Sequence, residues 1–151
     1  MEAFDVVIAG GAVMGSSTAY HLLADPAFNG SVLVVEKDMS YQRCASALSL
    51  ASIRQQFSSP VNIRISLYGI GFLKHAGEIL GVDGDRPEIA FHEGGYLYLA
   101  SDAGHSIPTE NQALQASEGA DIVLLDRAAL SERFPWLNVE DISVGTWGRS
   151  G

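Results

Sequence analysis

The sequence has little of three features that would restrict its class. Cys44 is its only cysteine, which excludes a disulfide framework and a cysteine-based zinc site and fits a reducing compartment such as the cytoplasm. No apolar run approaches the length of a membrane span, and the N-terminal residues reach the first expected strand so early that we expect no signal peptide. Nine basic residues stand against 18 acidic ones, and the net charge of −9 argues against nucleic acid as a partner. What remains is an ordinary globular composition, 47% hydrophobic and 18% charged, with enough apolar residues for one core.

The first part of the chain has the pattern of a βαβ unit that binds a dinucleotide. Residues 6–9 and 32–35 are short apolar runs, as expected of parallel strands that are buried on both faces. The glycine-rich residues 10–15 lead from the first strand into a helix, which should end at Pro26 because proline cannot continue a helix. Glu36 directly follows the second strand. Strand, glycine turn, helix, strand and acid thus occur in the order of a dinucleotide-binding unit.

Each position of this pattern has a physical role. Gly10 can make the tight turn that a residue with a Cβ atom resists, and Gly15 lets the helix lie close to the strand. The free N–H groups of residues 13–15 and the helix dipole attract a diphosphate. Glu36 lies 21 residues after Gly15, a spacing at which a carboxylate meets ribose hydroxyls and disfavours a 2′-phosphate. Ala12 stands where the G-x-G-x-x-G form has glycine, so a βαβ unit that binds nothing remains the alternative.

Residues 37–59 form a segment rich in serine and alanine. Small residues let a backbone pass close to a planar ligand, while hydroxyl and amide groups can bind phosphate oxygens and ring heteroatoms. The segment also contains Arg43 and Arg54. A polar surface loop that leads into a helix is the alternative interpretation.

The chain resembles the N-terminal part of the FAD-dependent oxidoreductases of the D-amino-acid oxidase superfamily, on the branch of sarcosine and dimethylglycine oxidoreductases. The likeness covers nearly the whole chain, and the IRQQFS segment and the order of the later stretches are more specific than the first motif, which many flavoproteins share. The matching stretches are VVIAGGAVMGSSTAYHL, VLVVEKD, SALSLASIRQQFS, EGGYLYLAS and LDRAALSERFPWL.

The resemblance implies which residues bind the cofactor FAD. The turn would line its diphosphate, Glu36 would bind the ribose with Lys37 under the adenine, and the arm after residue 42 would run along the diphosphate toward the flavin. The implied FAD-binding residues are Gly10, Gly11, Ala12, Val13, Met14, Gly15, Glu36, Lys37, Arg43, Ala45, Ser46, Ala47 and Ser49. Because some relatives attach FAD through a histidine in this arm, and no histidine lies between His21 and His75, we predict non-covalent FAD.

Arg54 aligns with an arginine that grips the substrate carboxylate in sarcosine oxidases. The role suits its chemistry, since the guanidinium fork matches a carboxylate in a bidentate way. The alternative is an arginine that orders a surface loop. We identify no catalytic acid or base and no metal site in the sequence.

The rest of the chain predicts helices and strands in alternation. Helical spacing of apolar residues predicts a long helix that starts at Pro60, although three glycines weaken it. The Glu93-Gly94-Gly95 segment between two short runs predicts a β-hairpin. The long helix should span residues 60–81, and the hairpin strands residues 89–92 and 96–100. The elements expected after them are a helix at 108–118, a strand at 120–125, a helix at 127–134 capped by Asp126, and a strand from Val144.

The expected fold class is α/β, with a Rossmann-like FAD-binding βαβ core and the beginning of an antiparallel α+β substrate domain. Residues 1–81 would form the N-terminal part of the FAD-binding domain, and residues 82–151 the first part of the substrate-binding domain. Members of the resembled family are more than twice as long, so we expect an incomplete fold that exposes apolar sheet and lacks activity by itself. A missing C-terminal half or a complementary chain would be its partner.

The resemblance implies oxidation of the C–N bond of an amino acid or an N-methylated glycine-type amine. Two alternatives stay open. One is a flavin-binding assembly factor or subunit of a dehydrogenase complex that has no catalytic activity. The other is a nicotinamide-dependent dehydrogenase, against which the Ser/Ala-rich arm argues.

Overall fold

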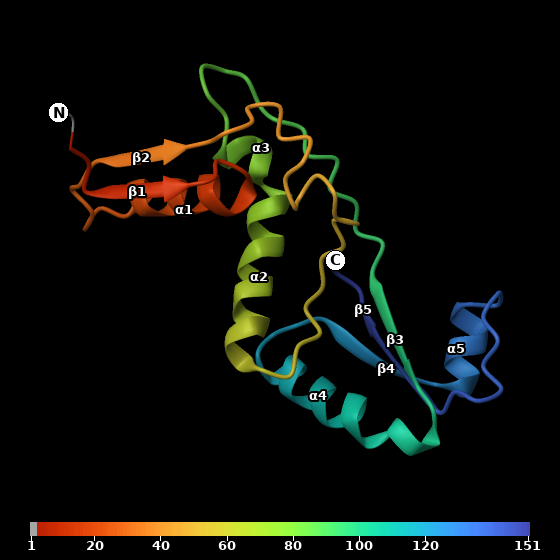
Figure 1. Cartoon of the computed structure of the whole chain (residues 1–151). Coiled ribbons are helices and arrows are strands. Elements are labelled where there is room, and N and C mark those ends of the chain that lie inside the picture. Colours follow the sequence, from red (N-terminus) through yellow and green to blue (C-terminus); the bar gives the residue numbers. More distant parts are fainter. Residues whose placement is uncertain (1–2) are drawn as a thin grey trace. The chain divides into compact units, whose positions relative to one another are not determined.

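The computed structural model describes residues 3–151, which divide into two compact units after Ser52 (Figure 1). The first unit contains a parallel sheet and one helix, and the second contains an antiparallel sheet and the remaining helices. Within residues 3–151, no helix is both long enough and apolar enough to cross a membrane.

The first unit is the βαβ arrangement that the sequence predicts. Strand β1 (Val6–Ala9) pairs in parallel with β2 (Val32–Val35), and helix α1 (Val13–Ala24) connects them. The helix ends before Pro26, because Asp25 is already extended with a ψ of 116°. These elements confirm the predicted order of strand, glycine turn, helix and strand.

The two strands are not buried on both faces, which corrects the expectation drawn from their apolar runs. Val7 is 60% exposed and Val35 is 52% exposed. The reason is geometric, since one helix can cover only one face of a two-stranded sheet. The exposed valines agree with the expectation that this chain presents apolar sheet surface to solvent.

Residues 36–52 contain neither helix nor strand and are ordered by local turns. The Asp38 carboxylate accepts the backbone N–H of Ser40 at 3.0 Å and its hydroxyl at 2.6 Å, which closes a turn directly after Glu36. Tyr41 and Ala51 have positive φ angles of 56° and 51°, so both residues adopt the left-handed conformation that is common in turns.

The second unit is built on a three-stranded antiparallel sheet of order β3-β5-β4 (Figure 1). Helix α4 packs against β4 and β5, and α5 packs against the same two strands. The elements are α2 (Pro60–Lys74), α3 (Ala76–Ile79), β3 (Tyr96–Ala100), η1 (Asp102–Gly104), α4 (Ser106–Ser117), β4 (Ile122–Asp126), α5 (Arg127–Arg133) and β5 (Val144–Gly148).

The helix predicted for residues 60–81 is broken in the structure. It begins at Pro60 as expected, but α2 ends at Lys74 and the short α3 follows. His75 lies between them with φ −112° and ψ 13°, and its Nδ1 is 2.9 Å from the Gly71 carbonyl oxygen. This bond and the low helix propensity of the nearby glycines favour an end to the helix at this point.

The β-hairpin predicted around Glu93-Gly94-Gly95 is wrong. Residues 89–92 form no strand, and β3 pairs with β5 instead, from Tyr96 opposite Gly148 to Ala100 opposite Val144. A positive φ angle of 51° at Ala90 turns the backbone away from the extended conformation that the predicted strand of residues 89–92 requires.

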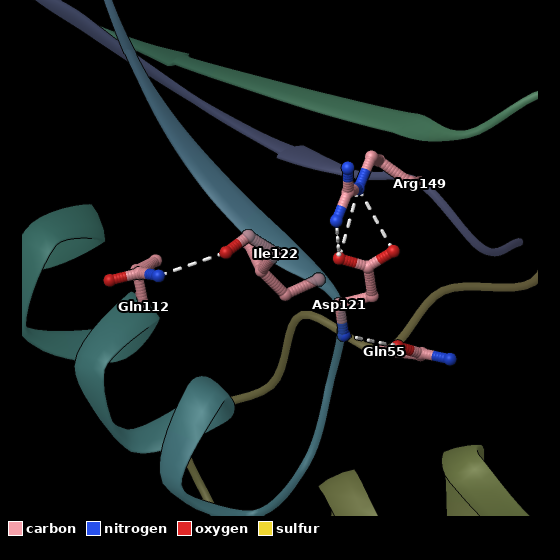
Figure 2. Close-up of polar contacts among 5 residues, drawn as sticks. All are labelled: Gln55, Gln112, Asp121, Ile122 and Arg149. Atoms are coloured by element: carbon pink, nitrogen blue, oxygen red, sulfur yellow. Dashed lines mark hydrogen bonds and ion pairs between the residues drawn. The ribbon is translucent and has the colours of Figure 1, made fainter.

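The remaining predicted elements are present within two residues of their expected bounds. Asp126 caps α5 as predicted, because its Oδ1 accepts the Ala129 N–H at 2.8 Å. Gln112 on α4 donates its Nε2–H to the Ile122 carbonyl at 2.8 Å, which ties that helix to β4 (Figure 2). The apolar core contains the buried residues Ile63, Ala120 and Ile122, against which Phe57, Leu67 and Leu114 pack.

The boundary between the compact units lies earlier in the chain than the expected domain boundary. Helix α2 packs on α4 and therefore belongs to the unit of the antiparallel sheet, although the sequence places it with residues 1–81. The division of the full-length protein into FAD-binding and substrate-binding domains at residue 81 stays a prediction.

Candidate functional site

The glycine turn holds α1 against the end of β1. Gly10 has a φ of 100°, a conformation that side chains with Cβ rarely adopt, and its N–H donates to the Val35 carbonyl at 2.8 Å. A Cβ atom at Gly15 would lie 1.8 Å from the Gly10 carbonyl oxygen. Both glycines are therefore required, one for the turn and one for the approach of the helix.

The start of α1 presents backbone donors. Ala12 supplies no side-chain cap, and the first helical bond runs from the Ser16 N–H to the Ala12 carbonyl at 2.9 Å. Within residues 3–151, the N–H groups of Val13, Met14 and Gly15 have no recorded acceptor. Together with the positive end of the helix dipole, these three N–H groups suit a diphosphate.

Ala12 departs from the glycine pattern without straining the backbone. Its φ is −68° and its ψ is −172°, an extended conformation that any residue adopts. At this position glycine is therefore not required by the backbone angles, whereas at Gly10 it is.

Glu36 lies directly against the glycine turn. Its carboxylate accepts the Asp38 N–H at 2.9 Å and the Gly11 N–H at 2.7 Å. These two bonds, with that from Asp38 the stronger influence, hold the pKa of Glu36 below its usual range. The carboxylate is therefore ionised at neutral pH, and each oxygen keeps a lone pair that can accept from a sugar hydroxyl.

Two cavities meet at Glu36. One has a volume of about 690 Å³ and includes Gly10, Lys37 and Arg43 in its wall, and the other has a volume of about 620 Å³ and includes Gly11. Both are also lined by Val35, Glu36 and Tyr41. A glycine turn, an uncapped helix end and two cavities that the ionised Glu36 carboxylate lines fit a dinucleotide such as FAD.

The structure does not bring the whole predicted arm to these cavities. Arg43 lines the larger one, but the predicted residues that follow do not line either cavity. They are held by local bonds instead, such as that from the Ser49 hydroxyl to the Ser46 carbonyl at 2.9 Å. These residues are Ala45, Ser46, Ala47 and Ser49.

Arg54 belongs to the second unit, where aromatic side chains surround it. Its Nη1 donates a hydrogen bond to the Tyr98 hydroxyl. The guanidinium carbon lies 4.7 Å from the ring centre of Phe57, 5.5 Å from that of Tyr98 and 5.9 Å from that of Tyr96. Of the nine lysines and arginines, all of which the structure describes, Arg54 alone is half-buried rather than exposed.

Sequence reasoning missed three residues that the structure places at these sites. Tyr41 and Asp38 line the larger cavity beside Glu36, and Tyr98 contacts Arg54. The Asp-x-Ser pattern of residues 38–40 is a turn signal that could have identified the first two. The alternation in YLYLA, which puts Tyr96 and Tyr98 on one face of a strand, could have identified Tyr98.

Comparison with known families identifies the chain's relatives. The family model DAO, described as FAD dependent oxidoreductase, matches residues 5–151. FAD-dependent oxidoreductase domain-containing protein 1 from Bos taurus is 42% identical over 150 residues, and that from Xenopus laevis is 43% identical over 150 residues. The alignments cover 97% of this chain but only 31% and 30% of those proteins, so the chain spans about a third of their length.

Solved structures share the fold at lower sequence identity. L-proline dehydrogenase from P. horikoshii superimposes with a TM-score of 0.76 at 23% identity, and the match covers 99% of this chain and 37% of the dehydrogenase chain. Glycine oxidase from Bacillus cereus gives a TM-score of 0.60 at 22% identity, with 98% of this chain and 39% of the oxidase chain covered. L-α-glycerophosphate oxidase from Mycoplasma pneumoniae, solved with FAD bound, gives a TM-score of 0.62 at 20% identity, with 99% of this chain and 38% of the oxidase chain covered.

Proposed function

The chain belongs to the DAO family of FAD-dependent oxidoreductases, and on that premise we propose that the full-length protein oxidises the C–N bond of a small amine that carries a carboxylate. The substrate class is an amino acid or an N-methylated glycine derivative. When bound, FAD supplies the two-electron acceptor for this chemistry. The residues of the chain bind and orient the two molecules.

In this proposal the first unit holds the cofactor without a covalent bond. The N–H groups of residues 13–15 bind the diphosphate, and the ionised Glu36 accepts hydrogen bonds from the ribose hydroxyls. Lys37 lies beneath the adenine, and residues 43–49 extend along the diphosphate toward the flavin. The uncapped helix start and the two bonds that fix Glu36 support the roles of residues 13–15 and of Glu36, whereas residues 45–49 line neither cavity of this chain.

Arg54 binds the substrate carboxylate in this proposal, and its environment is the observation that carries the substrate class. Arg54 is the one half-buried lysine or arginine among the described residues, and withdrawal from solvent favours a partner of opposite charge. Arg54 forms no ion pair with any residue from 3 to 151, whereas Arg64 and Arg149 each hold an acidic side chain. Its guanidinium can therefore donate hydrogen bonds to a carboxylate that comes from outside the chain.

The names of two similar structures support the amine assignment, because they refer to proline and glycine. The third structure is named for L-α-glycerophosphate, whose anion is a phosphate. A substrate panel must therefore contain this compound beside the amines.

The test is anaerobic titration of the full-length, FAD-loaded protein with sarcosine, N,N-dimethylglycine, L-proline, glycine and L-α-glycerophosphate. We expect at least one of the amines to bleach the visible absorption of the oxidised flavin. Bleaching by glycerophosphate alone would contradict the amine assignment. If FAD binds but no compound reduces it, a flavin-binding assembly factor without catalytic activity becomes the better interpretation.

Replacing Arg54 with alanine tests its role once a substrate is found. We expect the KM of the carboxylate-bearing amine to rise about tenfold or more, because a charge-assisted bidentate bond is lost. Arg64→Ala is the matched control, since it removes an exposed arginine whose surface ion pair with Glu118 contributes little to stability. An unchanged KM in Arg54→Ala would remove Arg54 from the site.

A further inference from the structure

We propose that Tyr98 is a positioning residue for Arg54, and that its hydroxyl leaves the Nε–Nη2 edge of the guanidinium free for the carboxylate of a small ligand. The inference rests on the proposed function of Arg54 and adds the residue that sets its geometry. Tyr98 lies on β3, and Arg54 precedes α2 in the chain.

The contacts around Arg54 constrain it in two ways. The ring centres of Phe57, Tyr96 and Tyr98 lie 4.7–5.9 Å from the guanidinium carbon of Arg54, which favours a cation at this place. Ring contacts alone do not determine which edge of the guanidinium faces Tyr98. The hydrogen bond from Nη1 to the Tyr98 hydroxyl fixes this orientation of the guanidinium. It is the only hydrogen bond recorded for the Arg54 side chain among the described residues.

The edge that remains is the one arginine uses elsewhere in this chain to hold a carboxylate. Arg64 binds both oxygens of Glu118 with Nε at 2.6 Å and Nη2 at 2.9 Å. Since Nη1 of Arg54 is engaged with Tyr98, the corresponding Nε–Nη2 edge can make the same bidentate bond to a ligand.

The charge of Arg54 is not compensated by Tyr98. Burial raises the pKa of the Tyr98 hydroxyl, against the opposing influence of the Arg54 charge. The tyrosine is therefore a neutral acceptor at physiological pH. The guanidinium keeps its full positive charge for an incoming anion.

Buried amides fix the backbone on which Arg54 stands. Gln56 is 7% exposed and donates its Nε2 hydrogens to carbonyl groups in β3 and β5 at 3.0 and 2.9 Å. Gln55 is 4% exposed, and its Oε1 accepts the Asp121 N–H at 3.3 Å (Figure 2). Arg149 in turn holds the Asp121 carboxylate, as Figure 2 shows. Arg54 therefore projects from a segment that is tied to the sheet on both β3 and the start of β4.

The test compares a carboxylate with its neutral isostere, so that the charge contact is measured separately from shape. Binding of 2-furoate and 2-furamide to the full-length, FAD-loaded protein is measured by isothermal titration calorimetry, which requires no turnover. We expect Tyr98→Phe to lower the affinity for 2-furoate about five- to tenfold, because one hydrogen bond that orders the guanidinium is lost. Binding of 2-furamide should not change.

A control and a second measurement separate positioning from general damage. Tyr68→Phe removes the same hydroxyl from a tyrosine on α2 that is 59% exposed, and it should bind both probes like the wild type. With an amino-acid substrate, Tyr98→Phe should raise KM by the same factor as the 2-furoate affinity falls, while kcat changes little.

The outcomes separate this inference from the proposed function. Equal loss of 2-furoate and 2-furamide, wild-type binding of 2-furoate by Tyr98→Phe, or no 2-furoate binding by the wild type would each overturn the inference. If the carboxylate effect is found but no amine reduces the flavin, the amine-oxidising function fails and the oxyanion site stands. If amines reduce the flavin and Tyr98→Phe changes nothing, the function stands and Tyr98 has no positioning role.

Discussion

Gly15→Ala is the substitution that tests most directly the proposal that the glycine turn binds the cofactor. The added methyl group would lie 1.8 Å from the Gly10 carbonyl oxygen, 2.9 Å from the Gly10 carbonyl carbon and 3.2 Å from the Cγ2 of Ile8. Ordinary van der Waals contact begins at 3.4 Å, so the helix has to withdraw by more than an ångström. Two of the three contacts are with backbone atoms, which cannot rotate away as a flexible side chain can.

The magnitude follows from what moves with the helix. Overpacking of this kind costs about 1–3 kcal/mol of folding free energy. The N–H groups at the start of α1 shift by the same distance, which lengthens charge-assisted bonds of about 1.5–3 kcal/mol each beyond useful range. We therefore expect the affinity for FAD to fall about ten- to a hundredfold.

The assay is titration of the full-length apoprotein with FAD, followed by flavin fluorescence and by thermal unfolding with and without the cofactor. Gly69→Ala in α2 is the matched control, because a Cβ atom there has no neighbour within 4 Å. Removing an unfavourable helical glycine should leave FAD affinity unchanged and stabilise the fold by about 0.4–1 kcal/mol. If Gly15→Ala binds FAD and unfolds like the wild type, the close packing of α1 on the turn has no role in binding.

Substitutions at two further positions test local electrostatics and capping. The carboxylate of Glu36 has a pKa below its ordinary 4.5, so its stabilisation of the turn is present above that value and lost as the pH falls through the lowered pKa. The difference in unfolding midpoint between wild type and Glu36→Gln should therefore shrink as the pH is lowered, and a constant difference would contradict this account. Asp126→Ala should destabilise the fold by about 1 kcal/mol in urea titration, because the cap of α5 is lost, while Asp126→Asn should retain most of it. Equal effects of the two substitutions would show that the cap bond is unimportant.

The local elements of this protein follow from the sequence because short-range chemistry decides them. Only glycine readily adopts the positive φ found at Gly10, and the carboxylate of Asp126 can reach the first turn of the helix that follows it. The position of Glu36 beside the turn also follows, since parallel pairing aligns the carboxyl ends of β1 and β2.

Strand pairing and the surroundings of Arg54 are decided only in the tertiary structure. The sequence near Gly95 suits a hairpin, yet β3 pairs with β5, which lies almost fifty residues later and serves as partner to β4 as well. No local pattern reveals this choice, because the competing partners differ only in long-range packing. Long-range bonds from Gln56 to β3 and β5 hold the neighbouring segment on this sheet, where Arg54 bonds Tyr98, 44 residues later in the chain. The sequence by itself therefore determined the glycine turn, because the backbone angles at Gly10 favour glycine, whereas the aromatic surroundings of Arg54 required the folded sheet.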